Sequence, residues 1–295
     1  MIVLAYHRVS DRTETSFSDK VMYRAENFYR DILWLKSNFD LVTLEHVSRY
    51  REYDEGCIAI TVDDGYRDSF LLTSDICEAE SVPLTHFVPS RVLRGMVLPW
   101  DHLSYLVKCT EHHESRGTVL GLRSIKTIEE KLNFIKDLKR HLKTYSEQKI
   151  LKCIADLSIE LEVSLREDRH SNLYVSHDDL CSVLSKNTLI DIGSHTTSHA
   201  ILSRQSDEVA NEQIFLSKVE LEKTLGRKIR YFAFPNGQHQ DFHSRHIEML
   251  KSAGYTAAFS AEPRIHPTTE CLFSFPRLCV NAHEELPVLL EDLRW

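Results

Sequence analysis

The segment at residues 58–65, IAITVDDG, constrains the fold of this chain more than any other. Its first five residues are apolar or β-branched, and they predict a buried strand. The strand ends in two adjacent acids, Asp63 and Asp64. Neighbouring carboxylates repel each other and are costly to desolvate, so packing alone does not favour them there. A metal ion would remove that cost, because one acid could ligate the ion while the other acts as general base.

A second cluster, much later in the chain, offers the remaining ligands. Residues 189–194, LIDIGS, predict another short buried strand, and they lead directly into His195 and His199. Two imidazoles four residues apart fall on one face of a helical turn and can bind one ion. With one aspartate oxygen they form a set of two histidines and one carboxylate, which leaves positions for water and substrate.

The spacing of the two histidines is weak evidence without its context. The chain has 16 histidines in 295 residues, so random placement gives roughly one pair at this spacing. A second pair, His239 and His243, lies among polar residues that predict a loop. The alternative for the main site is a turn-capping acid pair and a solvated histidine pair. That alternative does not explain why both clusters follow buried strands, where open α/β sheets place their sites.

Three motifs together resemble the polysaccharide deacetylases of carbohydrate esterase family 4, which share the NodB-homology domain. TVDDG at residues 61–65 is similar to the family's TFDDG motif, and SHTTSH at 194–199 is similar to its H(S/T)xxH motif. FAFPNG at 232–237 resembles the strand-end motif before the third active-site loop. The motifs occur in family order, and the likeness spans residue 1 to about 282, with one interruption.

This resemblance implies a fold, an activity and roles for named residues. The fold would be α/β, a distorted barrel of the (β/α)7 type. Asp63 would be the general base, and Asp64, His195 and His199 would hold one divalent ion. Zinc is the ion we expect, since two imidazoles and one carboxylate suit it. The reaction would remove N-acetyl groups from amino-sugar residues, with the ion and the backbone N–H of Tyr66 stabilising the oxyanion.

Two departures from the family pattern shift these roles. Many members carry an arginine where this chain has Ala233, and that arginine orients the base. Arg277, in FPRL at 275–278, could supply the guanidinium from another strand end, or it could be an ordinary surface arginine. Many members also end with an LxxH strand that provides the general acid, and no such strand follows residue 260.

The LxxH pattern stands instead at the start of the chain, as LAYH at residues 4–7. This arrangement resembles the circularly permuted branch of the family, which includes exopolysaccharide deacetylases that act on poly-N-acetylglucosamine. His7 then becomes the general-acid candidate, and His283 is its rival. The alternative for His7 is a histidine at a strand end with a backbone partner.

We expect one domain over residues 1–295, with a helical insertion at about 97–178. Strands are predicted at 2–9, 40–44, 58–62, 83–88, 231–234 and 256–260. Helices are predicted over 28–39, 70–79 and 206–226. In the insertion, Thr127 and Glu130 form a capping-box pattern ahead of a helical apolar repeat. The insertion could pack passively or roof the cleft, and Trp100 at its start could contact sugar or lie at the edge of a core.

Composition limits the partners and the compartment. The formal charge of −8 and the pI near 6.1 argue against nucleic acid and anionic membranes as partners. No stretch approaches a membrane span, and no signal-peptide pattern follows Met1. The seven cysteines are scattered without a CxxC pair, which predicts reduced thiols. We therefore expect a cytoplasmic enzyme whose substrate is an N-acetylated glycan or a lipid-linked or nucleotide-linked sugar precursor.

Two other functions fit the same residues. The chain could be a non-catalytic glycan-binding or scaffold protein of this fold, although such a protein would most simply have lost Asp63. It could also be a metal-dependent hydrolase of another acyl bond. The residues alone support only metal-assisted hydrolysis of an amide, ester or phosphoester, and the family resemblance supplies the substrate class.

Overall fold

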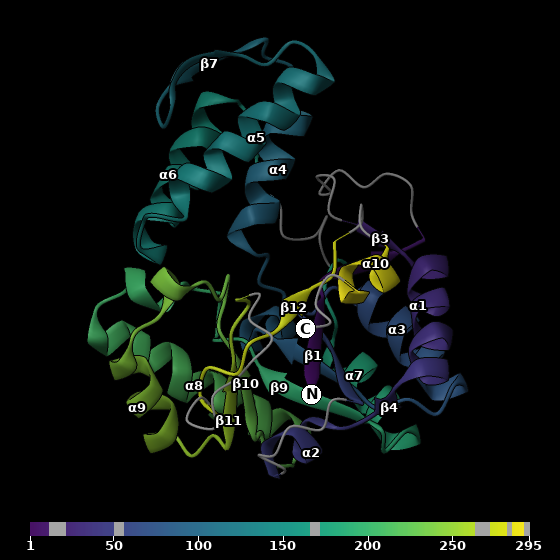
Figure 1. Cartoon of the computed structure of the whole chain (residues 1–295). Helices are drawn as coiled ribbons and strands as arrows, with labels where there is room; N and C mark the ends of the chain where they lie inside the picture. Colours follow the sequence, from purple (N-terminus) through teal and green to yellow (C-terminus); the bar gives the residue numbers. More distant parts are fainter. Residues whose placement is uncertain (12–21, 50–55, 166–171, 263–271, 282–284, 292–295) are drawn as a thin grey trace.

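A curled parallel sheet forms the centre of the protein, shown in Figure 1 as a computed structural model. The structure describes residues 1–11, 22–49, 56–165, 172–262, 272–281 and 285–291. The eight-stranded sheet has the order β11-β10-β9-β6-β5-β1-β12, with β4 paired to β5. Its strands are β1 (Ile2–Tyr6), β4 (Asp40–Leu41), β5 (Cys57–Val62), β6 (Leu84–Val88), β9 (Ile190–Ser194), β10 (Tyr231–Ala233), β11 (Ala257–Phe259) and β12 (Leu278–Cys279).

The segment before β12 joins the two edges of the curled sheet. Phe275 forms a parallel bridge with Phe259 of β11, and three residues later Leu278 pairs with Leu4 of β1. The seven strands of the main path therefore follow one another around a distorted barrel, and the predicted α/β fold of the (β/α)7 type is confirmed. The first and last of the described strands lie side by side in this barrel.

Helices surround the sheet. They are α1 (Ala25–Asn38), α2 (Leu44–Arg49), α3 (Arg67–Ala79), α7 (His177–Lys186), α8 (Asp207–Leu225), α9 (Ser244–Ser252) and α10 (Leu286–Glu291), with short 3-10 turns at Ser90–Arg94, Leu202–Arg204 and His239–Asp241. The predicted apolar face of α1 is confirmed, because Phe28, Ile32 and Leu35 are fully buried. Ser206 caps α8 and Gly226 ends it with a φ of 63°, as the sequence indicates.

Side chains alternate between the outer and inner faces of the strands. In β5, Ile58, Ile60 and Val62 pack outward in one hydrophobic cluster with α1 and α3. Cys57 and Ala59 point inward and pack in a second cluster with residues of β1, β6, β10 and β11. This inner set fills the barrel. Because side chains alternate, the residues that continue this set beyond the strand ends face the mouth of the barrel.

The predicted strand over residues 2–9 is interrupted at His7. The first part is β1, and the second is β2 (Arg8–Ser10), which leaves the main sheet and pairs in parallel with β3 (Met22–Arg24). Val9 of β2 bonds to Ser69 of α3 through both its backbone N–H and its carbonyl. His7 therefore sits at the point where the chain turns away from the end of the barrel strand.

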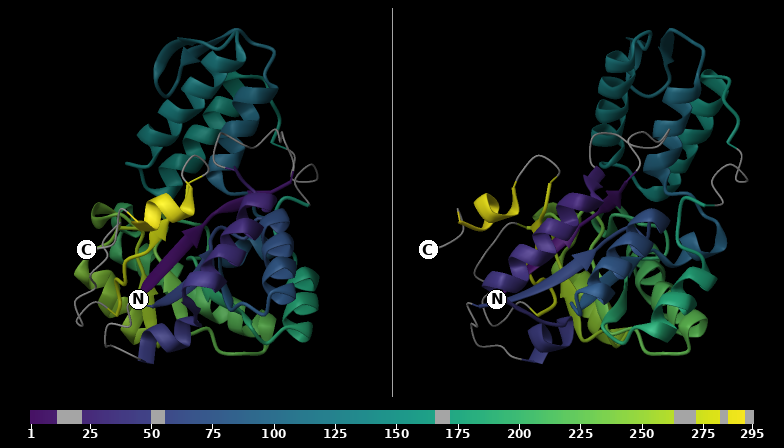
Figure 2. Two further views of the ribbon diagram at one scale, coloured as in Figure 1. Left: turned by 45° about the vertical axis from the view of Figure 1, so that its right-hand side comes forward. Right: turned by 90° about the vertical axis from the view of Figure 1, so that its right-hand side faces the viewer.

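The insertion is a bundle that stands on one side of the barrel (Figure 2). It contains α4 (Pro99–Cys109), α5 (Ile128–Leu142), α6 (Glu147–Glu160) and a hairpin of β7 (Glu114–Gly117) and β8 (Gly121–Ser124). It has its own core, made by one face of each helix. The predicted capping box of Thr127 and Glu130 is confirmed, whereas the hairpin was not predicted.

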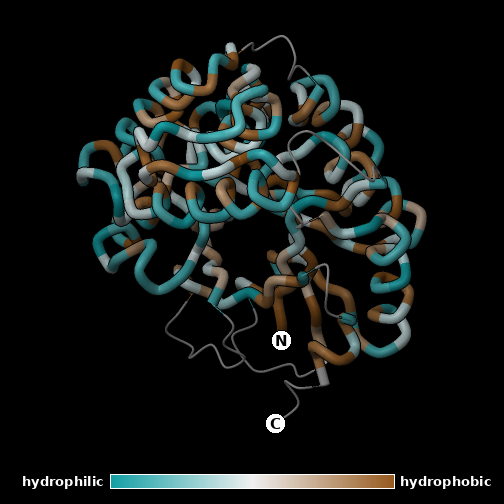
Figure 3. Tube along the Cα trace, turned by 90° about the horizontal axis from the view of Figure 1, so that it is seen from above, coloured by the Kyte–Doolittle hydropathy of each residue, from teal (hydrophilic) through white to brown (hydrophobic). Residues whose placement is uncertain are grey.

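The hydropathy of the chain follows this architecture. Strands near the N-terminus are drawn mainly in hydrophobic colours in Figure 3, while the surrounding helices alternate between the two colours. None of the described helices has a stretch long and apolar enough to cross a bilayer.

The barrel interior leaves no room for a side chain at Gly193 of β9. A Cβ atom there would lie 2.3 Å from Cε1 of Phe87 and 3.1 Å from the carbonyl oxygen of Tyr231. Because Phe87 is fully buried, we expect Gly193→Ala to lower the free energy of unfolding by about 2–3 kcal/mol, as overpacking does. Urea unfolding would measure the loss.

Phe87→Leu provides the test of this cause. If the clash is responsible, the double variant Gly193→Ala/Phe87→Leu should be clearly less destabilised than the sum of the single variants. Additive effects would contradict the explanation.

Candidate active site

Alternation along three strands brings three polar side chains to the mouth of the barrel. Asp63 continues the inward series of Cys57 and Ala59, and His7 continues that of Met1 and Val3. His195 follows Gly193 in the same way, on β9. All three follow the carboxyl ends of parallel strands, where α/β barrels place reactive groups. In Figure 2, β1 runs from the N-terminus towards the side that carries the insertion.

Asp63 forms a buried two-pronged ion pair with Arg277. The two Asp63 oxygens accept hydrogen bonds from Nη1 and Nη2 of Arg277 at 2.7 and 2.6 Å. Both side chains are almost completely buried. Arg277 also donates from Nη1 to the Thr61 hydroxyl and from Nε to the carbonyl oxygen of Ser260, each at 3.0 Å. Arg277 is therefore a core residue and not a surface arginine.

The charges around Asp63 keep it ionised. Burial raises the pKa of its carboxyl group, but the charges of Arg277, His195 and His7 outweigh burial and leave the pKa below its usual value. Asp63 is thus a carboxylate held in a fixed orientation, which is the state that a proton acceptor requires.

Asp64 faces two histidines instead of an arginine. Its Oδ1 lies 3.1 Å from Nε2 of His199 and 3.6 Å from Nε2 of His195. Although Oδ1 is buried, none of the described residues forms a well-aligned hydrogen bond with it. The three ligand atoms all lie within 4.8 Å of one another.

These separations fit a single metal ion. Adjacent ligands of a four-coordinate zinc ion lie about 3.4 Å apart when the bonds are about 2.1 Å long. The observed 3.1 and 3.6 Å lie on either side of that value. Oδ1 of Asp64 is buried, lies near Nε2 of both histidines and has no hydrogen bond from the described residues, as expected for an oxygen that binds a cation. The residues present therefore fit a divalent ion.

Backbone turns, not a helix, bring the ligands together. Asp64, Thr196 and His199 have positive φ angles of 75°, 64° and 61°. Residues 196–198 form a turn, and the segment 195–199 has no helical hydrogen-bond pattern. The predicted helical arrangement of His195 and His199 is therefore wrong. Non-glycine residues in this region are strained by roughly 1–3 kcal/mol each, and such strain is concentrated at functional sites.

The two histidines have different partners on their other ring nitrogens. Nδ1 of His195 lies 2.7 Å from the carbonyl oxygen of Ala233, so Nδ1 carries the proton and Nε2 is free to bind a metal. Nδ1 of His199 instead accepts a hydrogen bond from the indole N–H of Trp100, at 3.3 Å. Burial lowers the pKa of His199, as do the charges of His195 and Lys143, although Asp64 opposes them.

His7 lies within electrostatic reach of both carboxylates. Its charge contributes to lowering the pKa of Asp63 and of Asp64, and its half-buried side chain follows β1 directly. The backbone carbonyl of the preceding Tyr6 accepts a hydrogen bond from the N–H of Asp63 at 2.9 Å. The rival, His283, lies outside the described residues.

Hydrogen bonds from the two ends of the insertion hold the turn after β5, and the sequence did not reveal them. The hydroxyl groups of Tyr66 and Tyr174 both donate to the buried carboxylate of Asp101, the Tyr66 bond being 2.8 Å long. The backbone N–H of Val175 donates to the carbonyl of Gly65 at 2.9 Å. Asp101 lies in the first turn of the insertion, and 174–175 lie where the insertion returns. Only the pattern Trp100-Asp101, a carboxylate inside an apolar helix, could have drawn attention to it.

The second histidine pair plays no part in this site. The side chain of His239 is 90% exposed and lies 3.6 Å from Glu262, and the backbone N–H of His243 donates to His246 at the start of α9. The predicted polar loop is instead a short 3-10 turn at His239–Asp241, and His243 is the N-cap of α9.

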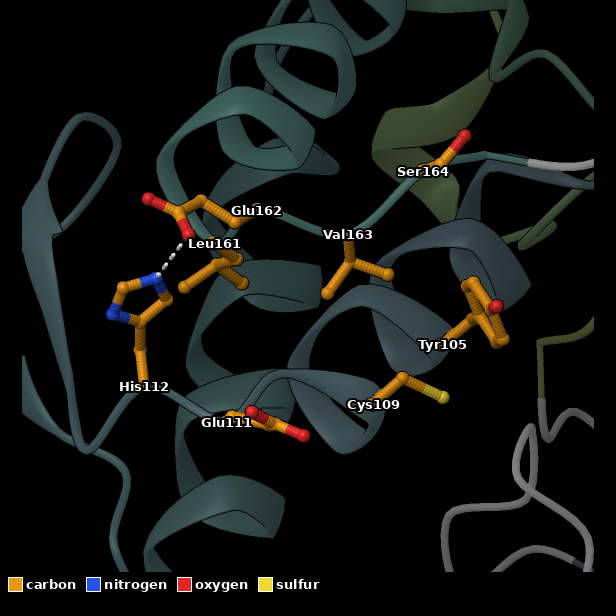
Figure 4. Close-up of a pocket in the computed structure, with 8 residues that line it drawn as sticks. All are labelled: Tyr105, Cys109, Glu111, His112, Leu161, Glu162, Val163 and Ser164. Carbon is orange, nitrogen blue, oxygen red and sulfur yellow. Dashed lines mark ion pairs between the residues drawn. The ribbon is translucent and has the colours of Figure 1, made fainter.

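A separate pocket lies in the insertion, away from the ligand set. It has a volume of about 320 Å³ between the ends of α4 and α6, and an ion pair of 3.6 Å joins His112 to Glu162 beside it (Figure 4). It contains none of the predicted catalytic or metal-binding residues.

Sequence comparison assigns part of the chain to a family. The family described as polysaccharide deacetylase matches residues 169–258, a segment that contains His195 and His199 and continues to β11. No match was found among curated proteins.

Structural comparison extends the similarity to the whole chain. The deacetylase PplD of Streptococcus pyogenes has a TM-score of 0.65 at 12% identity, with 100% of this chain and 98% of that chain covered. A de-N-acetylase from Aggregatibacter actinomycetemcomitans has a TM-score of 0.61 at 15% identity, with 98% of each chain covered. IcaB from Ammonifex degensii has a TM-score of 0.56 at 14% identity, with 95% and 91% covered. Residues 169–258 thus match the polysaccharide deacetylase family, and the described residues have the same fold as these solved structures.

Proposed function

We propose that this protein is a hydrolase that removes N-acetyl groups from amino-sugar residues of a polysaccharide or glycan precursor. The observation that carries the proposal is the different use of two adjacent carboxylates. Asp63 is paired with Arg277, while Asp64 faces His195 and His199. A base and a metal-binding set therefore lie side by side, as metal-assisted hydrolysis of an amide requires.

Asp64, His195 and His199 would hold one divalent ion, for which zinc is our proposal. When bound, the ion would act as a Lewis acid towards the acetyl carbonyl and would favour an attacking water. Asp63 accepts the proton of that water, and Arg277 keeps its carboxylate oriented and charged. The backbone N–H of Tyr66 contributes to stabilising the oxyanion.

His7 completes the reaction by protonating the departing amine. It enters from β1, whose neighbours in the sheet are β5 and β12. The acid and the base therefore come from adjacent strands, and the charge effect of His7 on Asp63 supports their proximity.

The proposed substrate is an N-acetylated precursor made inside the cell, linked to a lipid or a nucleotide. The support is the cysteine pattern: the structure describes six of the seven cysteines, which are scattered over the barrel and the insertion and are not joined by disulfides. Such a pattern is typical of a reducing compartment.

Deacetylation is tested by incubating the zinc-loaded protein with N-acetylated oligosaccharides. We expect one free amine for each acetate released. Asp63→Asn should keep stoichiometric metal and lose most turnover, because only the base is removed. His199→Ala should lose both metal and turnover, which elemental analysis would show.

These outcomes separate the alternatives. Acetate released only from O-acetyl substrates would indicate another acyl hydrolase, and no acetate from any substrate would indicate a binding or scaffold protein. Equal loss of metal in Asp63→Asn and Asp64→Asn would contradict the division of labour between the two acids.

The role of His7 predicts a specific kinetic pattern. His7→Ala should fold and bind metal but lose about 10²–10⁴-fold in turnover, as expected for a missing proton donor. The loss should be smaller with an aryl acetate ester, since that leaving group departs without a proton. His283→Ala is the control: if it abolished deacetylation while His7→Ala did not, His7 would not be the acid.

The buried ion pair predicts a pH-dependent loss of stability. Arg277→Met leaves Asp63 buried and unpaired, and we expect it to lower the free energy of unfolding by about 3–5 kcal/mol at pH 7. In the unmodified protein the lowered pKa of Asp63 contributes stability above its unfolded pKa of about 3.9. In the variant burial raises that pKa, so stability falls as the pH rises. The difference between the two proteins should therefore grow between about pH 4 and pH 7.

Denaturant unfolding of both proteins in chelator would measure this difference. The double variant Asp63→Asn/Arg277→Met should recover part of the stability and lose most of the pH dependence, because no buried charge remains. A loss that is equal at pH 4 and pH 7 would show that the ion pair is not its cause.

A further inference from the structure

Trp100 links the insertion to a proposed metal ligand. It occupies the first turn of α4, and its indole Nε1 lies 3.3 Å from Nδ1 of His199. Nε2 of the same imidazole lies 3.1 Å from Oδ1 of Asp64. The ring of His199 is thus held between Trp100 on one side and the ligand cluster on the other.

The hydrogen bond from Trp100 determines where His199 carries its proton. An indole N–H can only donate, so Nδ1 of His199 must accept. A neutral imidazole has one N–H, which then belongs to Nε2, on the side of the ring that faces the ligand cluster. Nε2 therefore has no lone pair for a metal ion while this hydrogen bond exists.

Metal binding requires the opposite tautomer. A neutral imidazole that ligates through Nε2 carries its proton on Nδ1, and that proton would face the indole N–H of Trp100. Two donors cannot share a hydrogen bond, so they would repel each other. His195 has no such conflict, because its Nδ1 faces the carbonyl oxygen of Ala233. The two histidines of the proposed metal site therefore differ in tautomer: His195 carries its proton on Nδ1, whereas the hydrogen bond from Trp100 places that of His199 on Nε2.

We propose that the indole N–H of Trp100 competes with the metal ion for His199, so that metal binding releases Trp100. This inference rests on the proposed metal site and adds a consequence for the insertion. The next residue, Asp101, binds the hydroxyl groups of Tyr66 and Tyr174. The first turn of α4 thus contacts both the metal ligand and the turn after Asp64, and releasing Trp100 loosens one of its two attachments.

Tryptophan fluorescence tests the release directly. The chain has three tryptophans, so the variant Trp34→Phe/Trp295→Phe leaves Trp100 as the only one. Titrating the metal-free variant with Zn²⁺ should change its emission and saturate at one equivalent. The matched control is Trp100→Phe/Trp295→Phe, which keeps only Trp34. Its emission should not respond, since Trp34 lies on α1 and packs against Phe39 at the end of that helix.

Metal affinity tests the competition. Trp100→Phe keeps an aromatic ring and removes the N–H, so it should bind Zn²⁺ roughly 2- to 10-fold more tightly, the equivalent of one lost hydrogen bond. Trp34→Phe should bind as the unmodified protein does. Equal or weaker binding by Trp100→Phe, or an emission of Trp100 that Zn²⁺ does not change, would overturn the competition.

The measurements also distinguish this inference from the proposed function. If the unmodified protein bound no Zn²⁺, the metal site itself would be wrong and the competition would fail with it. If it bound one equivalent while Trp100 neither responded nor affected affinity, only the competition would be wrong. Because the emission measurement keeps the native Trp100, it does not depend on how well Trp100→Phe folds.

Discussion

The buried pair of Asp63 and Arg277 holds the barrel and its mouth together. Arg277 precedes β12 and reaches across the interior to Asp63 after β5, to Thr61 within β5 and to the carbonyl of Ser260 after β11. These contacts join the last strand to both sides of the closing sheet. A buried ion pair is costly to desolvate, and it persists only where several hydrogen bonds compensate the charges. Here the same bonds that close the barrel also orient the proposed base.

The order of the strands explains how distant segments meet at this mouth. The chain begins at β1, between β5 and β12, so the first and last described strands are neighbours. His7 and Arg277 therefore reach Asp63 from opposite ends of the sequence. A circular permutation preserves such a site, because the strands keep their places in the sheet while the chain ends move. The proposed role of His7 is therefore compatible with an LxxH pattern on the first described strand instead of the last.

The sequence predicted the features that depend on local pattern, and it missed those that depend on tertiary contact. Alternation in β5 places Asp63 inside the barrel, and a strand followed by Gly-Ser places His195 at the same edge. Arg277 is predicted as the partner of Asp63 because Ala233, which stands where many family members have an arginine, carries no charge. The left-handed turns at Thr196 and His199 were mistaken for a helix, since a spacing of four also fits a turn. Asp101 was missed because its partners lie far away in the sequence.

The attachment of the insertion follows from where its two ends meet the barrel. At the beginning of the insertion, Trp100 donates a hydrogen bond to His199, and Asp101 accepts one from Tyr66. The returning end pairs with the turn after β5 through backbone hydrogen bonds from Val175 to Gly65 and from Arg67 to Leu173. Both ends therefore hold the loop that carries Asp64, whose positive φ needs such external support. An insertion joined in this way cannot move as an independent lid, because any displacement at its base acts on the geometry of the ligand set.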